Sequence, residues 1–118
     1  MTEDTAAFLQ ALEELEGALE RNLETIEHAR KRIAYLRREL AAGRKLPEIV
    51  PAEDTPVLVR LLTESANLLH TYGTRVRRTE ARALHREGMT MEEIATLFGV
   101  SRQRVSQLLR DVAVEPQP

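Results

Sequence analysis

Residues 91–110 read MEEIATLFGVSRQRVSQLLR, and this stretch decides the fold of the C-terminal part of the chain. Apolar residues at helical spacing stand on both sides of Gly99, which predicts two short helices joined by a tight turn. Glycine ends a helix readily because it adopts the left-handed cap conformation at little cost. Ser101 can then cap the second helix through its hydroxyl. Because only Gly99 and Val100 separate the helices from this cap, we expect the two helices to cross steeply.

The first helix of this pair begins at Thr90, two residues after Gly88 ends the helix before it. Thr90 and Glu93 have the spacing of a capping box, in which each side chain bonds the backbone amide of the other residue. A steep crossing needs a small residue at the contact, and we expect Ala95 there, with Val100 and Val105 filling the corner. The apolar residues of the pair are Ile94, Ala95, Leu97, Phe98, Val100, Val105, Leu108 and Leu109.

The outer face of the second helix is rich in Arg and Gln. Arg pairs with O6 and N7 of guanine, and Gln pairs with N6 and N7 of adenine. No carboxylate occurs between Gly99 and Arg110, which suits a surface that faces phosphates. Glycine-linked helix pairs also occur as ordinary helical hairpins, but a merely solvated face more often carries Glu and Lys. We therefore expect base-reading contacts from Arg102, Gln103, Ser106, Gln107 and Arg110.

The segment resembles the bacterial helix-turn-helix superfamily, in particular the promoter-reading region 4 of sigma factors and many small regulators. The resemblance covers about residues 78–110 and does not extend to the first 75 residues. It implies that residues 101–110 form a recognition helix that enters the major groove of double-stranded DNA. The residues that carry the resemblance are Ile94, Ala95, Phe98, Gly99, Val100, Val105 and Leu108, with the strings 90–93 and 99–107.

The segment before the motif, TRVRRTEARALHREG (residues 74–88), carries a cluster of arginines. Its apolar residues Val76, Ala81, Ala83 and Leu84 are expected to pack beneath the helix pair as a third helix. A single surface Arg is usually just solvated, but a cluster beside a recognition helix favours phosphate contacts, which hold register without reading sequence. The expected contacts to the DNA backbone are Thr90, Ser101, Arg104, Arg77, Arg78 and Arg82.

The charge of the chain is distributed unevenly. The formal net charge of the 118 residues is −2, yet residues 56–110 hold nine Arg against five Glu. Residues 1–27, in contrast, hold eight acidic residues and one basic residue. The basic excess therefore coincides with the predicted DNA-binding segment, which is the quantity that matters for attraction to DNA.

Several functional classes find no support in the sequence. There is no Cys, and His28, His70 and His85 are too far apart for paired metal ligands. No glycine-rich phosphate loop and no nucleophile with a base are found, so we expect no enzyme, cofactor or metal site. No apolar run approaches a membrane span of about 20 residues. The acidic N-terminus differs from a signal peptide. We expect a cytoplasmic protein, and 15 Arg against 2 Lys hints at a high-GC bacterial genome.

Residues 3–42 predict one long helix, because they contain no Pro and a single glycine, Gly17. Apolar residues alternate at spacings of three and four, as in a coiled coil of about five heptads. Leu9 and Leu23 widen this stripe, and we expect a second helix to cover that side. The seam consists of Phe8, Leu12, Leu15, Leu19, Asn22, Ile26, Ala29, Ile33, Leu36 and Leu40.

Charge predicts how two such helices pair. The helix is acidic up to Glu27 and basic from Arg30 onward, so an antiparallel pair places acid against base. Asn22, near the middle, would then meet its copy near a two-fold axis and fix the register. The other interpretation is that the seam packs only within one chain. We expect both kinds of packing, with dimerisation through Leu12, Leu15, Leu19, Asn22, Ile26, Ile33 and Leu36.

The middle of the chain predicts a second bundle helix that starts near Asp54–Pro56. Gly73 is expected to bend or break it. Its expected core line consists of Leu58, Leu62, Leu69, Tyr72 and Val76.

The sequence thus predicts an all-α fold, in which a long N-terminal dimerisation helix and a second helix form a bundle that carries a C-terminal helix-turn-helix. The predicted function is sequence-specific DNA binding by a homodimeric transcriptional regulator. The alternatives are an architectural, DNA-bridging protein and an adaptor whose coiled coil binds another protein, such as polymerase or a sigma factor. The predicted segments are 1–42 (dimerisation helix), 43–53 (linker), 54–76 (bundle helix), 77–111 (DNA-binding unit) and 112–118 (tail).

Overall fold

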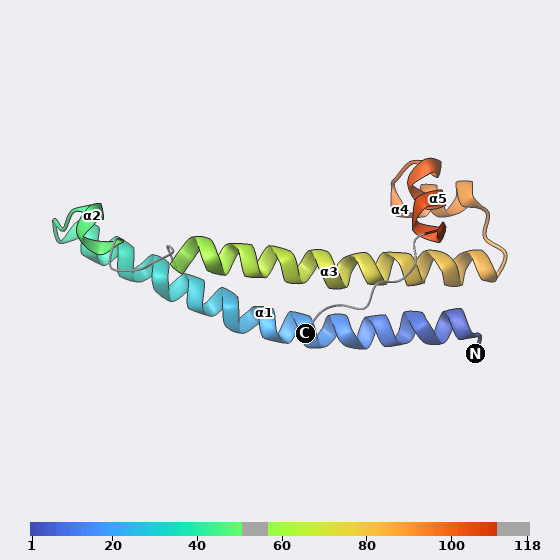
Figure 1. Ribbon diagram of the computed structural model, residues 1–118, viewed down its shortest axis with the longest axis horizontal. Coiled ribbons are helices and arrows are strands. Elements are labelled where there is room, and N and C mark those ends of the chain that lie inside the picture. The colour runs from blue at the N-terminus through green and yellow to red at the C-terminus, as the bar shows by residue number, and fades with distance from the viewer. Residues whose placement is uncertain (51–56, 111–118) are drawn as a thin grey trace. The chain divides into compact units, whose positions relative to one another are not determined.

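The computed structural model describes residues 1–50 and 57–110, and its regular structure over these residues is entirely helical. The all-α prediction is therefore confirmed. The expected helix start at Asp54–Pro56 and the tail 112–118 lie outside the described residues. In chain order, the helices are α1 (Glu3–Ala41), α2 (Leu46–Ile49), α3 (Val57–Arg86), α4 (Met91–Phe98) and α5 (Arg102–Arg110) (Figure 1).

The two long helices follow from their sequences with one difference. α1 occupies nearly the whole Pro-free stretch that predicted it. α3 continues through Gly73, where we expected a bend or a break, so Gly73 does not break the helix and the predicted boundary between residues 76 and 77 falls inside it. A glycine inside a helix costs about 1 kcal/mol, which the packing of a 30-residue helix tolerates. The linker also contains α2, which has Pro47 in its first turn and buries Ile49.

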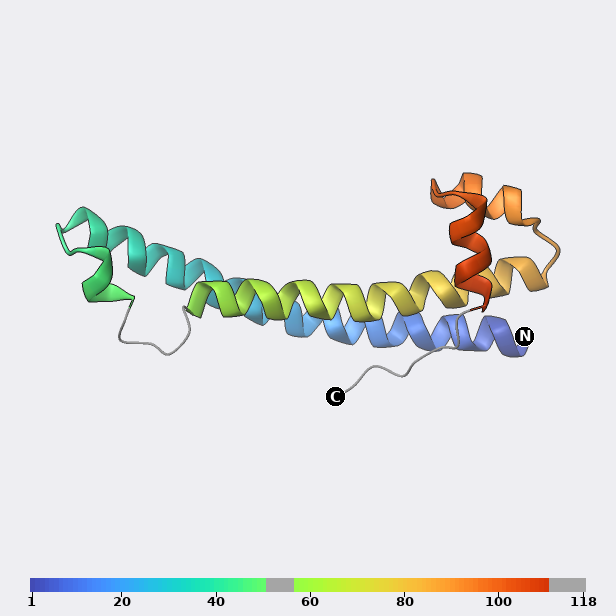
Figure 2. The ribbon, with the colours of Figure 1, turned by 45° about the horizontal axis from the view of Figure 1, so that its top comes forward.

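The chain forms two compact units, residues 1–17 with 70–118 and residues 18–69. In the first unit, the start of α1 runs beside the end of α3, as Figures 1 and 2 both show. Ala11 is fully buried there, and Arg75 of α3 forms an ion pair with Glu14 of α1. Small and charged side chains thus join the two helices in this unit.

The helix-turn-helix of the first unit is built on α3. Its buried core consists of Ala81, Ile94, Ala95, Val105 and Leu108, with Leu84, Met89, Met91, Phe98 and Leu109 packed against it. Of the four residues expected to pack beneath the helix pair, Ala81 and Leu84 are confirmed, whereas Val76 and Ala83 are not part of this core. α3 is therefore the third helix of a trihelical arrangement, and Figure 2 shows α5 running steeply across the direction of α3.

In the second unit, α1 buries or half-buries one row of the predicted seam (Asn22, Ala29 and Leu36) and leaves the other exposed (Leu19, Ile26, Ile33 and Leu40). Ala18 is fully buried and Asn22 is only 4% exposed, whereas Leu23, on the side expected to be covered by the second helix, is 67% exposed. The expectation that a second helix covers the side of Leu23 was wrong. Small side chains such as Ala18 let a neighbouring helix approach closely, since the distance between packed helices depends on the side chains at the contact.

The core line predicted for α3 is correct only in part. Leu61 is buried at 4% exposure, while Leu62 and Leu69 are 58% and 43% exposed. Leu58, Tyr72 and Val76 are half-buried. Arg75 lies fourteen residues, or two heptads, after Leu61 on the same side of α3, and it pairs with Glu14 of α1 in the first unit. Because the apolar face of α3 is broad, the sequence did not show whether Leu61 or Leu62 is buried.

Candidate nucleic-acid interface

The turn of the helix-turn-helix has the predicted cap geometry. Thr90 Oγ1 accepts a hydrogen bond from the Glu93 amide, and Glu93 Oε1 accepts one from the Thr90 amide, both at 3.2 Å. Gly99 ends α4 in the left-handed conformation with φ +68°. Ser101 Oγ then accepts a hydrogen bond of 3.0 Å from the Arg104 amide and so caps α5. The local sequence therefore determines where α4 begins and ends and where α5 begins.

Packing in the core fixes which face of α5 points outward. Ile94 and Val105 are completely buried, Leu108 is 1% exposed, and the small Ala95 lies at the expected crossing. Val100, which we expected to fill the corner, is 38% exposed because it stands in the turn outside this core. With Val105 and Leu108 anchored inward and Leu109 packed against the core, Arg102, Gln103, Gln107 and Arg110 face solvent.

Four of the five residues predicted to read bases are exposed on this outer face. They are Arg102, Gln103, Gln107 and Arg110, and Ser106 is half-buried. Arg104 Nη1 donates a hydrogen bond of 2.9 Å to Gln107 Oε1. An Arg and a Gln whose polar groups already bond each other can approach a base pair or a phosphate as a preformed pair. The structure thus brings the predicted residues together on one helix face.

Sequence reasoning missed one carboxylate at this face. Glu92, in the first turn of α4, lies with its Oε1 3.2 Å from Nε of Arg102, and both side chains are largely exposed. The absence of acidic residues between Gly99 and Arg110 holds for α5 itself, but the turn brings Glu92 back beside its N-terminal end. The position of Glu92 in the capping region of α4 is the signal that would have revealed it, because the steep turn returns that region to the start of α5.

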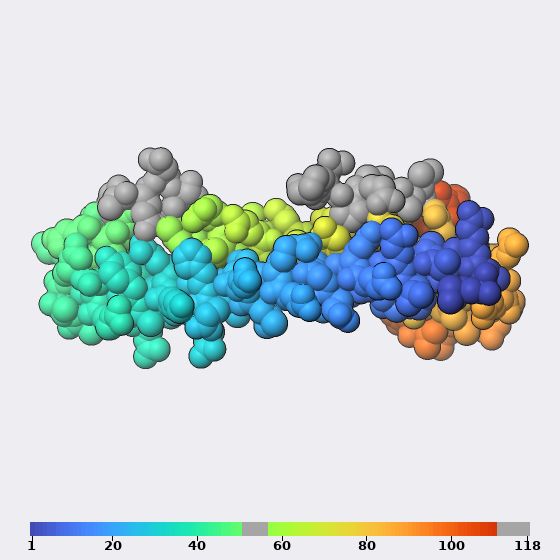
Figure 3. All heavy atoms as spheres, turned by 90° about the horizontal axis from the view of Figure 1, so that it is seen from below, coloured from blue at the N-terminus to red at the C-terminus, as the bar shows by residue number. Residues whose placement is uncertain are grey.

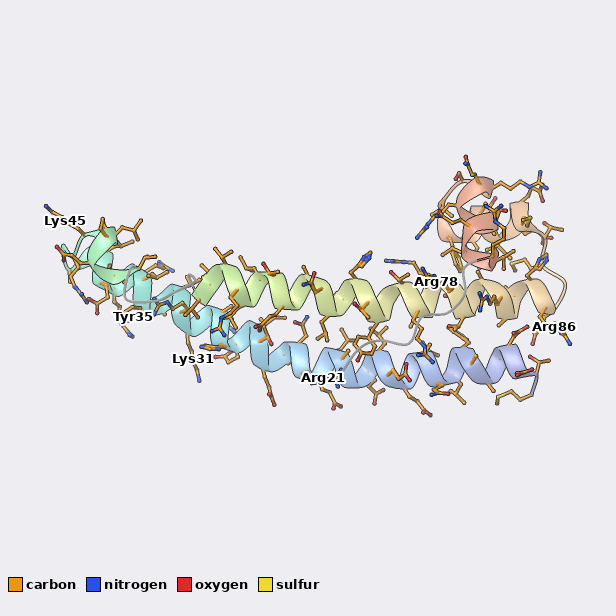
Figure 4. The ribbon with its side chains drawn as sticks, viewed as in Figure 1. Arg21, Lys31, Tyr35, Lys45, Arg78 and Arg86 are labelled. Atoms are coloured by element: carbon orange, nitrogen blue, oxygen red, sulfur yellow. The ribbon has the colours of Figure 1, made fainter. Side chains whose placement is uncertain are left out.

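The arginine cluster of α3 divides into different environments. Arg75 is 8% exposed and pairs with Glu14, so it belongs to the helix packing of the first unit. Arg77 is exposed, whereas Arg82 is half-buried. Arg78 is half-buried with its Nε inaccessible to solvent, and Figure 4 shows its side chain on the side of α3 where α4 and α5 lie. Arg86 is exposed at the end of α3.

A surface hollow of about 310 Å³ lies between α3 and the turn that joins α4 to α5. Arg77 from α3 and Arg104 from α5 both line it, so two arginines far apart in the sequence meet at one site. The other lining residues are Glu80, Leu97, Phe98, Val100 and Leu108. Two arginines that line one hollow can contact neighbouring phosphates of a DNA backbone.

Two further findings concern residues 1–50 and 57–110 only. None of their helices is long and apolar enough to cross a membrane. No group of three or more His, Asp or Glu side chains among them is arranged to hold a metal ion.

Comparison with known proteins agrees with this geometry. Residues 85–113 match the model of the family described as Sigma-70, region 4. No curated protein and no solved structure matches the chain. The family match covers α4, α5 and the turn between them, which are the elements that form the exposed Arg- and Gln-rich face. This segment is therefore a sigma-factor region 4-like helix-turn-helix of the DNA-binding superfamily.

Proposed function

We propose that the protein binds double-stranded DNA sequence-specifically as a homodimer and regulates transcription in the bacterial cytoplasm. In this proposal α5 enters the major groove, and Arg102, Gln103, Ser106, Gln107 and Arg110 contact base edges. Phosphates are held by Thr90, Ser101, Arg104, Arg77, Arg78 and Arg82.

The observation that carries the proposal is the two-sided character of α5. Val105 and Leu108 are buried to 1% exposure or less, which holds the helix in one orientation. The opposite side presents Arg102, Gln103 and Gln107 to solvent. Long donor-rich side chains on a rigidly held helix are what direct readout in the major groove requires, since bidentate bonds to bases depend on fixed geometry. The family match of residues 85–113 supports the same conclusion.

The roles within the interface follow from position. Arg102 stands in the first turn of α5, where recognition helices contact base edges. Arg77 and Arg104 line one hollow beside the turn and suit phosphates on the flanking backbone. A carboxylate, Glu92, bonds Arg102 in the free protein. Binding to DNA requires this carboxylate to release Arg102, so the ion pair opposes recognition.

Selection of bound duplexes from a random-sequence pool tests the proposal. We expect enrichment of an inverted repeat, whose two half-sites correspond to the two subunits of a dimer. The matched control is Arg102→Ala, which removes a base contact while leaving the buried side of α5 intact. Recovery without enrichment indicates an architectural role, and absence of binding indicates an adaptor. Either result contradicts the proposed function.

A further inference from the structure

One aliphatic row of α1 is left uncovered by the rest of the chain, as far as the structure describes it. In the second unit, Leu19, Ile26, Ile33 and Leu40 follow one another at intervals of seven residues, and each is between 42% and 47% exposed. Leu12, in the first unit, begins the same row in the sequence and is 40% exposed. We call these five residues the α1 row. Figure 3 views the side of the molecule on which α1 lies in front of α3.

The α1 row is more apolar than the row that α1 buries within the chain. The row of α1 that precedes the α1 row by one residue contains Ala18, Thr25 and Arg32, and Ala18 is fully buried. Small, polar and apolar residues share the internal packing of α1, since Ala18 and Asn22 are buried and Leu15 and Leu36 are half-buried, whereas the five Leu and Ile side chains of the α1 row are exposed. Apolar residues repeated every seven positions on a helix are the pattern of a coiled-coil seam.

α3 extends this apolar face in the second unit. Leu62 and Leu69 are 58% and 43% exposed. Leu62 comes one residue after the buried Leu61, just as Leu19 of the α1 row comes one residue after the buried Ala18. In an antiparallel helix pair, positions related in this way lie on the same flank. The two helices of this unit thus offer one broad apolar surface, and a contiguous exposed surface of this kind marks an interaction site.

We propose that the α1 row binds the α1 row of a second copy of the chain, antiparallel, with Ile26 on the two-fold axis. Ile26 is the middle residue of the row, so that Leu19 faces Ile33 and Leu12 faces Leu40 across the interface. Every aliphatic side chain then meets another one. A two-fold interface requires such self-complementarity, because one patch serves on both subunits.

Charge beside the row selects the antiparallel direction. The residues four positions after Leu12 and Ile33 are Glu16 and Arg37, and the antiparallel pairing brings Glu16 of each copy near Arg37 of the other. Glu13 and Glu20 likewise lie in the half that faces the partner's basic half, whereas Glu27 lies beside the axis. A parallel pairing would place these acidic residues against their own copies, which is destabilising at flanking positions of helix pairs.

This surface specifies the interface of the proposed homodimer and stands independently of DNA binding. It also moves the two-fold axis from Asn22, where we expected it, to Ile26. Asn22 is 4% exposed within a single chain and is therefore not available to a second copy, whereas Ile26 is 45% exposed.

The chain contains no cysteine, so single substitutions report the geometry of the dimer directly. We would prepare Ile26→Cys, Leu19→Cys and Ile33→Cys in the full chain and treat each with a short bifunctional maleimide. In the proposed dimer, two copies of position 26 meet, whereas two copies of position 19 lie about 21 Å apart along the helix. We expect I26C to crosslink alone, and L19C and I33C to crosslink only when mixed. Ala34→Cys, about 100° around α1 from Ile33, is the exposed control.

The other crosslinking outcomes overturn the proposal. Equal crosslinking of each variant alone indicates a parallel pair, and no crosslinking above that of A34C indicates that the row binds no second copy. Independently, Ile26→Glu should raise the dimer dissociation constant by more than about tenfold, because it buries like charges at the axis, whereas Ala34→Glu should not. Sedimentation measures this constant, and circular dichroism confirms that both variants remain helical. If I26C crosslinks to its own copy but the protein selects no DNA site, this interface is supported and the proposed function is rejected.

Discussion

The guanidinium of Arg75 lies 3.2 Å from the carboxylate of Glu14 and links α3 to α1 within the first unit. The Arg75 side chain is 10% exposed and that of Glu14 is 29% exposed. Thr79 Oγ1 bonds the backbone carbonyl of Arg75 at 2.9 Å and is buried with it. Arg75 therefore acts in helix packing, although by sequence it belongs to the basic cluster expected to face DNA.

Removing the carboxylate of this pair should destabilise the protein. We expect Glu14→Gln to lower the free energy of unfolding by about 1–3 kcal/mol, because it removes a carboxylate that pairs with the buried guanidinium of Arg75. Urea denaturation followed by circular dichroism measures this change. The exposed Glu16 is the matched control, and Glu16→Gln should change stability by less than about 0.5 kcal/mol. Equal effects of the two substitutions would show that the ion pair contributes nothing.

The helix-turn-helix was predictable from sequence because its signals are local. Capping by Thr90 and Ser101, the left-handed Gly99 and the buried Val105 each depend on residues within a few positions of one another. Local signals of this kind predict where helices start, stop and turn. The exposed positions of Arg102 and its neighbours on α5 then follow from which residues are apolar.

The packing of the long helices was not predictable in the same way. The predicted seam of α1 contains two rows, and sequence spacing alone does not show that the row of Asn22 is buried within the chain while the row of Leu19 is exposed. The choice depends on the shape of the partner helix, since small residues permit close approach. The contacts of Arg75 with Glu14 and of Arg102 with Glu92 escaped prediction because each joins residues from different helices.

Two glycines of the chain should respond to the same substitution with opposite signs. Gly99 has φ +68°, a conformation that costs an L-residue about 1–2 kcal/mol, so Gly99→Ala should destabilise the protein by that amount. Gly73 lies inside α3, where an added Cβ meets no atom within 4 Å. Gly73→Ala should therefore stabilise the protein by about 0.5–1 kcal/mol. Thermal denaturation of the two variants compares them, and a shared sign would contradict the assigned backbone conformations.

Arg102 and Glu92 should be coupled in DNA recognition. Arg102→Ala should weaken binding to the selected duplex by about 1–3 kcal/mol and relax the preference at one base pair. Glu92→Gln should strengthen binding to all duplexes by up to about 1 kcal/mol, because it removes a negative charge and an exposed ion pair of that strength. In the double variant, the Gln substitution should have a smaller effect, since the ion pair is already gone. Fluorescence anisotropy titrations of the four proteins measure the coupling, and strict additivity would show that Glu92 acts independently of Arg102.

Arg77 should contribute to affinity without contributing to sequence preference. It is exposed on α3 and lines the same hollow as Arg104, whereas the Nε of Arg78 is shielded from solvent. Arg77→Ala should weaken binding to every duplex to a similar degree and lower the slope of log affinity against log salt by about one. Arg60, an exposed arginine of the second unit, is the control whose replacement by Ala should leave this slope unchanged. A loss confined to the preferred duplex would instead place Arg77 against a base, since a phosphate contact is insensitive to sequence.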